Sequence, residues 1–405
     1  IIIGSGIAGL TAAYKLQHSG YSVSVFERAE RVGGAINTYA QNGWMAEYGP
    51  NTILETNTQI KTLITELGLD GEKLYPNSVS TNRFIVKNGK LLPLPISPLA
   101  FFSSSLFSTK SKFNIIREPF LPKWQNHYEE SLSEFVLRRL GQNFLDYAVN
   151  PFVAGVFAGD PNKLSVKHAL SKLYKLEQDY GSLIKGQIKK AKLPAQSDDI
   201  PKNRAKMFSF RNGLKELPET LASKLKTPIE FNVTVEQVQK LNEGWEITYN
   251  QQNEIKTLKA DNLIYAGTGH QLANCKIMNN KNLDLSFGNE IEYPPVATLT
   301  LGFHKNQIQH ALNGFGLLVP QVENLQILGA LFNSSLFPYR APDDHVTITV
   351  FMGGVRQPEL ALESEEKRLD IAVNDLTMLL GITGSPAFIF HKQWTKAIPQ
   401  YNVGY

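Results

Sequence analysis

The chain has 405 residues, too long for one compact core, so two or three domains are expected. Its formal net charge of +4 gives no overall basis for nucleic-acid binding, and its single cysteine, Cys275, excludes a disulfide framework or a thiolate metal cluster. No apolar run is long enough to cross a membrane, because the nearest one, residues 91–102, carries Pro93, Pro95 and Pro98. We expect that stretch to be a loop, or a strand edge followed by a loop.

The first element is a short β-branched strand, Ile1 to Ile3, and because the chain starts inside it we expect further residues before it. A GxGxxG turn follows, formed by Gly4, Ser5, Gly6, Ile7, Ala8 and Gly9. A tight turn, a close approach of pyrophosphate and close helix packing each favour glycine there. The next helix ends at Gly20, and the second strand ends at Glu27, an acid placed to accept hydrogen bonds from a ribose. This order predicts a dinucleotide site but leaves NAD and FAD open.

The segment RAERVGGAINT comes next and places Gly33 and Gly34 in a flexible turn that exposes amide donors. Here the sequence resembles the flavoprotein superfamily that includes amine oxidases, carotenoid desaturases and protoporphyrinogen oxidases. The resemblance implies FAD, bound non-covalently, because the second glycine pair lets the backbone approach the diphosphate. The stretch AEYGPNTILETN, residues 46–57, matches a segment that runs past the flavin ring in those proteins.

The cofactor-binding residues that the loop and the resemblance together predict are Gly4, Ser5, Gly6, Ile7, Ala8, Gly9, Glu27, Arg28, Gly33, Gly34, Ala35, Gly49, Pro50, Asn51, Thr52, Val235 and Trp394.

Beyond this region a helix is predicted from about Gln59 to Leu67, and NRFIVKNGKLLPLP predicts a hairpin with Asn88 and Gly89 in its turn. Residues 98–204 are mostly helical in pattern, with a capping box, SLSE, at 131–134. Lysine and arginine outnumber the acids between Lys163 and Lys215. This excess favours either a solvated helical face, an anionic membrane surface or an acidic substrate.

From residue 206 the resemblance to the flavoproteins resumes, and three strands, in IEFNVTVEQVQKL, GWEITY and LIYAG, are predicted to return to the nucleotide domain. Residues 290–390 alternate short strands with turns and predict a second sheet. The chain ends on WTKAIPQYNVGY, where relatives continue into a further glycine-rich flavin segment. We therefore expect part of the flavin-binding domain to lie outside this chain.

Three stretches are similar to the oxygen-dependent, FAD-containing protoporphyrinogen oxidase family: residues 150–170, residues 82–95, and residues 329–342 with the preceding residues 314–320. The first leaves bare backbone at Gly155, beside which a flat macrocycle could lie. In the second, Arg83 matches an arginine that pairs with a substrate propionate, as a guanidinium suits a carboxylate. In the third, Phe332 matches an aromatic residue that stacks on a pyrrole ring, and Leu317 or its neighbour Leu318 packs from the other side. Taken alone, a strand phenylalanine is more often a core residue.

The resemblance implies an α/β (α+β overall) fold with three domains. These are a discontinuous Rossmann-like FAD-binding domain (1–75, 205–275 and 393–405), a mixed-sheet substrate-binding domain (76–97 and 276–392), and a helical, basic domain of the membrane-binding type (98–204).

The implied reaction oxidises protoporphyrinogen IX to protoporphyrin IX, with dioxygen as acceptor and hydrogen peroxide as product. The sequence contains no side-chain catalytic group or metal site that we would assign, so the flavin carries the redox chemistry. Coproporphyrinogen III oxidation, another amine oxidase or desaturase activity, and a non-catalytic porphyrin or nucleotide carrier remain alternatives. The expected partners are a porphyrinogen, dioxygen, an anionic membrane surface and a second copy in a homodimer, with no nucleic acid. The expected location is the cytoplasm, peripheral to the cytoplasmic membrane.

Overall fold

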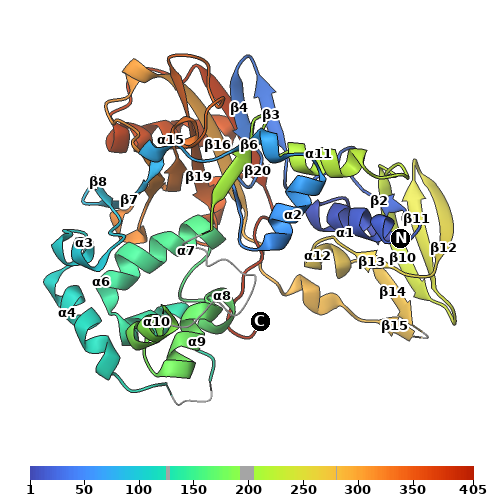
Figure 1. The fold of residues 1–405 in the computed structure, drawn as a ribbon, viewed down its shortest axis with the longest axis horizontal. Helices are drawn as coiled ribbons and strands as arrows, with labels where there is room; N and C mark the ends of the chain where they lie inside the picture. The colour runs from blue at the N-terminus through green and yellow to red at the C-terminus, as the bar shows by residue number, and fades with distance from the viewer. Residues whose placement is uncertain (125–127, 192–204, 280) are drawn as a thin grey trace. The chain divides into compact units, whose positions relative to one another are not determined.

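The computed structural model describes residues 1–124, 128–191, 205–279 and 281–405 (Figure 1). The chain forms two compact units. The first comprises residues 1–41, 45–75 and 199–291, and the second comprises residues 42–44, 76–198 and 292–405. Residues 393–405, predicted to belong to the FAD-binding domain, lie in the second unit, and the helical region shares that unit with residues 292–392.

The first unit is built around short strands. Its elements are β1 (Ile2–Ile3), α1 (Ile7–His18), β2 (Val25–Phe26), β3 (Thr38–Gln41), β4 (Trp44–Glu47, whose first residue belongs to the second unit), β5 (Ile53–Leu54), α2 (Thr58–Glu66), β6 (Lys73–Leu74), β9 (Met207–Phe210), α11 (Glu216–Ser223), β10 (Val233–Lys240), β11 (Trp245–Gln251), β12 (Glu254–Ala260), β13 (Ile264–Tyr265), α12 (Gly269–Leu272), β14 (Lys276–Asn279) and β15 (Lys281–Leu283).

The part of this unit that contains the glycine loop is a parallel sheet in the order β13-β1-β2. β1 pairs Ile2 with Ile264 on one side and with Val25 on the other, so the first strand is central. α1 buries Leu10, and its C-terminal turn is followed by Gly20 in the left-handed region, as predicted. The strand, loop, helix and strand predicted from the first 27 residues are confirmed.

The other strands of the first unit form separate sheets. Of the three strands that were predicted to return to the nucleotide domain, β10 and β11 join the five-stranded order β12-β11-β10-β14-β15, and only β13 pairs with β1. The strands themselves were predicted correctly. Their division between two sheets depends on pairings with β12 and β14 that no local pattern specifies.

The second unit combines one large sheet with a group of helices. Its elements are β7 (Asn82–Lys87), β8 (Lys90–Pro93), α3 (Pro98–Ser103), α4 (Thr109–Arg117), α5 (Leu132–Arg139), α6 (Gln142–Phe144), α7 (Asn150–Phe157), α8 (Val166–Ala169), α9 (Ser171–Tyr180), α10 (Leu183–Ala191), β16 (Val296–His304), β17 (Gly314–Leu318), β18 (Ile327–Leu331), α13 (Asn333–Leu336), β19 (His345–Gly353), α14 (Pro358–Leu362), α15 (Glu365–Leu380) and β20 (Phe388–Trp394).

The seven strands of this sheet follow the order β20-β16-β19-β18-β17-β7-β8. The predicted hairpin is confirmed as β7 and β8, and Asn88 and Gly89 both take positive φ in its turn (51° and 68°). One face of the sheet packs against α15 to form the largest buried apolar cluster of the unit, which includes Leu299, Val350 and Leu376. Figure 1 shows α15 beside the strands β16 and β19.

The region after β8 is helical, with one difference from the prediction. Pro98, expected to keep residues 91–102 from forming a helix, lies in the first turn of α3, where a missing backbone N–H costs nothing and Ser97 caps the helix. The capping box at Ser131 and Glu134 is confirmed. Residues 192–204, part of the basic stretch noted in the sequence, lie outside the described residues. Within the described residues, no helix combines the length and apolar character that crossing a membrane requires.

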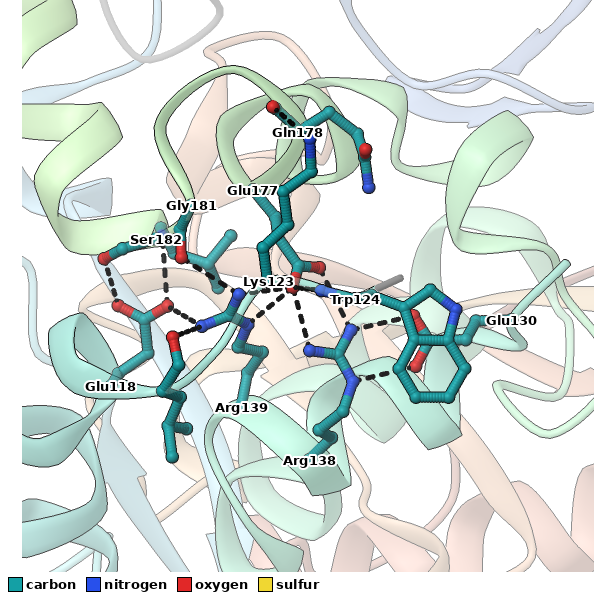
Figure 2. Close-up of polar contacts among 12 residues, drawn as sticks. Glu118, Lys123, Trp124, Glu130, Arg138, Arg139, Glu177, Gln178, Gly181 and Ser182 are labelled. Atoms are coloured by element: carbon teal, nitrogen blue, oxygen red, sulfur yellow. Dashed lines mark hydrogen bonds and ion pairs between the residues drawn. The ribbon is translucent and has the colours of Figure 1, made fainter. Parts of the chain in front are cut away.

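The helical region encloses a buried group of charged side chains that the sequence did not predict (Figure 2). Arg139 on α5 is paired with Glu177 on α9 and, at 3.3 Å, with Glu118, and all three side chains are fully buried. Arg138 bonds to both Glu177 and Glu130, each at 2.8 Å. We call these five residues the buried ion-pair network. Because each charge has an oppositely charged partner, the network offsets the desolvation cost that an isolated buried charge would carry.

Glu118 and Arg139 also bond to the ends of the helices that they connect. Glu118 accepts hydrogen bonds from Ser182 Oγ (2.6 Å) and from the backbone N–H of Leu183 (2.9 Å), which begins α10. Arg139 donates to the carbonyl of Gly181 at the end of α9 (3.0 Å). A carboxylate at a helix N-terminus and a cation at a C-terminus both complement the helix dipole. The network therefore fixes the turn between α9 and α10.

Candidate active site

The glycine loop between β1 and α1 has the geometry that a phosphate requires. Gly4 has φ +104°, a conformation that favours glycine, and a Cβ on Gly9 would clash with the carbonyl oxygen of Gly4. By contrast, a Cβ on Gly6 would meet nothing within 4 Å. Gly6 is the N-cap of α1 and has no side chain to cap it, so the first N–H groups of the helix can serve an anion.

Glu27, the predicted ribose acceptor, is fixed at this loop. Its Oε2 accepts hydrogen bonds from the N–H and the hydroxyl of Ser5, each at 2.7 Å, and its Oε1 accepts one from Ala29 N–H at 2.9 Å. A carboxylate has about four acceptor positions, so Oε1 keeps one for a ribose hydroxyl. The backbone of Glu27 also bonds to Val233 (2.9 Å), which places the start of β10 beside it.

The second glycine segment joins the first. Gly33 pairs with Gly6 in an isolated parallel bridge, and the Gly33 N–H donates to the Ser5 carbonyl at 2.9 Å. A Cβ on Gly34 would lie 3.4 Å from Gly6 Cα, and Gly34 is exposed. Gly6 and Gly33 are 27 positions apart in the sequence, yet the two glycine segments form one bare stretch of backbone. This open cradle fits a dinucleotide diphosphate.

The remaining predicted cofactor residues lie on several different elements. Ala35 and Gly49 are adjacent, since a Cβ on Gly49 would lie 2.8 Å from the Ala35 carbonyl oxygen, and Asn51 Nδ2 bonds to that same glycine's carbonyl at 3.2 Å. Val235 lies at a bulge in β10 and packs with the cluster that contains Phe26, the residue before Glu27.

For four of the predicted cofactor-binding residues, the structure does not test whether they bind the cofactor. Arg28 and Pro50 are exposed, and Thr52 is half-buried. Trp394 is the last residue of β20 in the second unit, where Lys392 lies over its ring at 4.6 Å. Binding of the cofactor by any of them stays a prediction.

In the second unit, Arg83 lies on the face of the seven-stranded sheet that is opposite α15. β7 and β17 run parallel and pair Arg83 with Gly316 and Ile85 with Leu318, so these four residues share one face. Arg83 is exposed, and its guanidinium lies over the ring of Phe315 at 5.2 Å. In the part of the chain that the structure describes, no carboxylate lies within ion-pair distance of Arg83. The guanidinium is therefore available to an acidic ligand.

Gly155 belongs to this same face. It lies on α7, is exposed, and a Cβ there would be only 2.5 Å from Leu318 Cδ2. The backbone of α7 thus lies directly against β17, and on the exposed side of the helix stand Phe152 and Val156 (41% and 49% exposed). Bare backbone flanked by apolar side chains, with Arg83 on the neighbouring strand, suits a flat apolar molecule that carries a carboxylate.

Leu317 and Phe332, the other two predicted substrate contacts, lie elsewhere. Leu317 is paired with Phe84, and both point into the core beneath α15, where Phe332 is also fully buried. The pleat alternates successive side chains between the two faces, so Leu317 and Arg83 cannot share one. The face of Arg83 holds Leu318, the neighbour of Leu317, instead. It also holds Leu331 of β18, which pairs with Gly316 of β17.

The sequence contained a signal for this difference. In NRFIVK, the apolar residues Phe84 and Val86 lie two positions apart and both belong to the core. Leu317 in β17 and Val319 directly after it show the same alternation. Following that period across both strands would have assigned Leu318 rather than Leu317 to the side of Arg83.

His310 is a titratable group that contacts Phe332, with ring centroids 5.8 Å apart. Its Nδ1 accepts a hydrogen bond from Leu312 N–H (3.0 Å), and burial lowers the pKa of its imidazole. The ring is therefore neutral near pH 7 with its proton on Nε2, and it packs edge-on to Phe84 on the core side of the sheet. Across the described ranges, no three His, Cys, Asp or Glu side chains are gathered as a metal site would need.

Comparison with known proteins shows the family to which the chain belongs. Residues 7–405 match the family described as flavin containing amine oxidoreductase. The chain is 35% identical to Protoporphyrinogen oxidase 2, chloroplastic/mitochondrial, of Arabidopsis thaliana, over its whole length and 84% of the relative. It is 27% identical to Coproporphyrinogen III oxidase of Bacillus subtilis, over its whole length and 88% of that protein.

Solved structures agree on the fold. A crystal structure from an Exiguobacterium species superposes with a TM-score of 0.80 at 22% identity, covering the whole chain and 87% of the other protein. Cyclohexylamine oxidase from Brevibacterium oxydans gives a TM-score of 0.69 at 16% identity, covering the whole chain and 89% of the enzyme. The chain therefore belongs to the family of flavin-containing amine oxidoreductases, and among its relatives it is similar to protoporphyrinogen oxidases.

Proposed function

We propose that this protein is an FAD-dependent oxidase that converts protoporphyrinogen IX to protoporphyrin IX. The observation that carries the proposal is the sheet face formed by Arg83, Leu318 and Gly155, where an exposed guanidinium without a carboxylate partner adjoins bare helix backbone. A porphyrinogen is flat over each pyrrole, apolar over most of its surface, and carries propionates. The similarity to protoporphyrinogen oxidases over the whole chain supports the same reading.

FAD is the flavin that the glycine loop suits. The loop supplies N–H groups and a helix N-terminus for a diphosphate, and Glu27 keeps an acceptor position for the ribose of an adenosine half. Gly34, next to Gly6, extends the bare backbone along which such a diphosphate can run. When bound, the flavin accepts a hydride equivalent from the substrate and passes the electrons to dioxygen.

The residues of this chain have binding and positioning roles in that reaction. Removing six electrons and six protons from protoporphyrinogen takes three two-electron steps, and three dioxygen molecules become three of hydrogen peroxide. Arg83 would hold a propionate through paired N–H donors and so fix the orientation of the macrocycle. The bare backbone at Gly155 would allow the macrocycle to lie closely against α7.

The test is an assay of the complete protein. We expect a yellow preparation with flavin absorbance that turns colourless protoporphyrinogen into fluorescent protoporphyrin, with one hydrogen peroxide formed for each dioxygen consumed. The variant Arg83→Ala should raise the KM by about tenfold, the size expected for a lost hydrogen bond to a charged group, with a smaller change in kcat. A preparation that binds no flavin, or that leaves protoporphyrinogen unoxidised, would refute the proposal.

Coproporphyrinogen III is the second candidate substrate, because two relatives at 26–27% identity are named coproporphyrinogen III oxidases. It has four propionates where protoporphyrinogen has two. The two porphyrinogens should be assayed side by side under the same conditions. A kcat/KM that is higher for coproporphyrinogen would assign the enzyme to that reaction instead.

Attachment to an anionic membrane surface in the cytoplasm forms part of the proposal. Leu99, Phe113, Ile116 and Phe120 on and after α3 and α4 are between 56% and 83% exposed. Lys185 lies 5.7 Å from the ring of Phe120, so basic and apolar groups occur together, as they do in segments that bind at a lipid interface. We expect flotation with phosphatidylserine vesicles, and loss of flotation in the variant Phe113→Glu/Phe120→Glu. Equal recovery of both proteins in the soluble fraction would count against this attachment.

A further inference from the structure

The turn that follows β19 contacts both ends of α7. The Val355 N–H donates to the carbonyl of Ala158, the C-cap of α7, at 2.7 Å. The side chain of the next residue, Arg356, reaches Asn150, the first residue of the helix, and donates from Nη2 to its Oδ1 at 3.3 Å. The Arg356 side chain therefore extends along α7 from its end towards its beginning.

Two glycines make this approach feasible. Gly353 and Gly354 have φ of +94° and +69°, in the region that favours glycine. A Cβ on Gly354 would lie 2.5 Å from the Ala158 carbonyl oxygen, and a Cβ on Gly353 would lie 2.8 Å from the Pro295 carbonyl oxygen. The turn thus sits against backbone on both sides, with no room for side chains.

The other bonds of Arg356 connect α7 to β17. Both of its terminal nitrogens donate to the carbonyl of Val319, the residue after β17, at 3.1 Å. Asn150 is held from the same side, because its Oδ1 also accepts from Gln321 N–H at 2.9 Å and its Nδ2 donates to Gln321 Oε1 at 3.3 Å. Arg356 therefore bridges the beginning of α7 and the end of β17.

An ion pair does not account for the position of Arg356. Among the described residues, no carboxylate lies within ion-pair distance of its guanidinium. Burial lowers the pKa of the guanidinium to about 10, and the nearby charge of Asp160 only partly opposes this. The group is still charged near pH 7, so a half-buried cation forms its hydrogen bonds only with neutral carbonyl and amide oxygens. Such an arrangement gains little Coulomb energy in return for its desolvation.

The elements that Arg356 bridges are those that form the candidate substrate face. Gly155 of α7 lies against Leu318 of β17, and Leu318 directly precedes Val319. With 3.6 residues per turn, Asn150 lies on nearly the opposite side of the helix from Phe152. The guanidinium therefore acts on this face through α7 and does not lie on it.

We propose that Arg356 is a positioning residue for the substrate face, which it maintains by fixing α7 against β17. This inference rests on the proposed porphyrinogen oxidase function. If the tie is removed, α7 can shift relative to Leu318, and the surface beside Gly155 no longer matches the macrocycle. Arg83, on the neighbouring strand β7, would still hold the propionate.

The experiment compares full-length wild type with Arg356→Met, which keeps the length of the stem and removes the donors. We expect unchanged flavin content and flavin absorbance, and a KM for protoporphyrinogen raised about tenfold, within the range that a displacement of about 1 Å can cause. Arg356→Lys should recover part of the loss, as should guanidinium ion at low millimolar concentration added to Arg356→Met. The exposed Arg117→Met is the matched control and should behave as wild type.

The protoporphyrinogen dimethyl ester separates positioning from direct contact. If Arg356 positions α7, Arg356→Met should change the KM of the acid and of the ester by the same factor. A change confined to the free acid would show that Arg356 binds a propionate and would overturn the proposal, as would an unchanged KM. If Arg356→Met does not fold, Asn150→Ala removes the acceptor on α7 and carries the same test. If the wild type oxidises no porphyrinogen, the proposed function itself is refuted. If the wild type is active and Arg356→Met has the same KM, only the positioning role of Arg356 is refuted.

Discussion

The glycine loop of the first unit and the buried ion-pair network of the second are both built from polar groups. In the loop these groups are available to a ligand, whereas in the network they bond to one another. Around Gly6 and Gly34 the backbone is bare, and no side chain caps the first N–H groups of α1. In the network, Glu118 and Glu177 accept bonds from two or more segments each, and Arg139 is fully enclosed. Open donors serve a ligand, whereas mutually satisfied charges fix helices to one another.

The two regions also differ in how far apart their members lie in the chain. Gly4 to Gly9 form the glycine loop within six residues, and Glu27 follows after one helix and one strand. Glu118, Arg139 and Glu177 come from three separate helical segments. A local motif tolerates changes around it, while a network assembled from distant segments fails as a whole when one member is lost. The following predictions test that difference.

The largest effect is expected from Arg139→Met. The substitution leaves Glu177 and Glu118 without their shared partner in a fully buried position, which should cost about 3–5 kcal/mol. Thermal unfolding of the purified protein would show a clearly lower midpoint. Lys367→Met, which breaks the exposed pair with Glu363, is the control and should leave the midpoint nearly unchanged. Equal midpoints for the two variants would contradict a stabilising role for the network.

Acid should weaken the helical region through Glu177. Burial opposes ionisation of this carboxyl, but hydrogen bonds from Arg138 and Arg139 outweigh it and hold its pKa below the usual 4.5. A lowered pKa in the folded state contributes stability above pH 4.5, and that stability is lost as the pH falls through the folded pKa. Between pH 7 and pH 3, the thermal midpoint of wild type should therefore fall more than that of Glu177→Gln. Parallel curves would show that another group controls the acid response.

In the glycine loop, Gly6→Ala and Gly9→Ala should separate binding from folding. The methyl group at Gly6 meets nothing within 4 Å, so this variant should fold normally and lose flavin affinity by about tenfold, because the methyl group occupies phosphate space. The methyl group at Gly9 clashes with the Gly4 carbonyl, so this variant should lose about 1–3 kcal/mol of stability as well. Flavin titration and thermal unfolding of both variants provide the measurements. Retention of wild-type flavin affinity by Gly6→Ala would remove the loop from the site.

The smallest effect is expected from Ser131→Ala at the start of α5. The variant loses one member of a capping box that satisfies two backbone N–H groups, at a cost of about 1 kcal/mol. Thermal unfolding should show a shift well below that of Arg139→Met, although both residues belong to the same helix or its cap. A loss as large as that of Arg139→Met would mean that the cap, rather than the network, holds α5 in place.

Local patterns allowed much of this molecule to be predicted. The Asn88–Gly89 turn, the α1 helix after the glycine loop and the capping box at Ser131 all follow from interactions between residues a few positions apart. The same holds for the acid that follows the second strand. Such features survive in the fold because their geometry is set before any long-range contact forms.

Other features could not be read in this way. Leu317 and Leu318 differ by one position, and the apolar alternation separates their faces, but only the tertiary structure makes β17 the neighbour of β7 and so places Leu318 on the face of Arg83. Phe332 follows a strand in a stretch that resembles a substrate-binding segment, yet it points into the core beneath α15. Arg138, Arg139 and Arg356 carry the same charge in the sequence, but the first two are enclosed by carboxylates and the third by neutral oxygens.

By itself the sequence determined the glycine loop, the acid after the second strand and the hairpin that carries Arg83, because each depends on backbone conformations that a few neighbouring residues impose. Only the tertiary structure decided which face each strand residue occupies, which charges meet in the helical region, and that one turn after β19 holds both ends of α7. These arrangements depend on pairings between segments far apart in the chain, where burial and hydrogen-bond satisfaction choose among many partners of the same residue type.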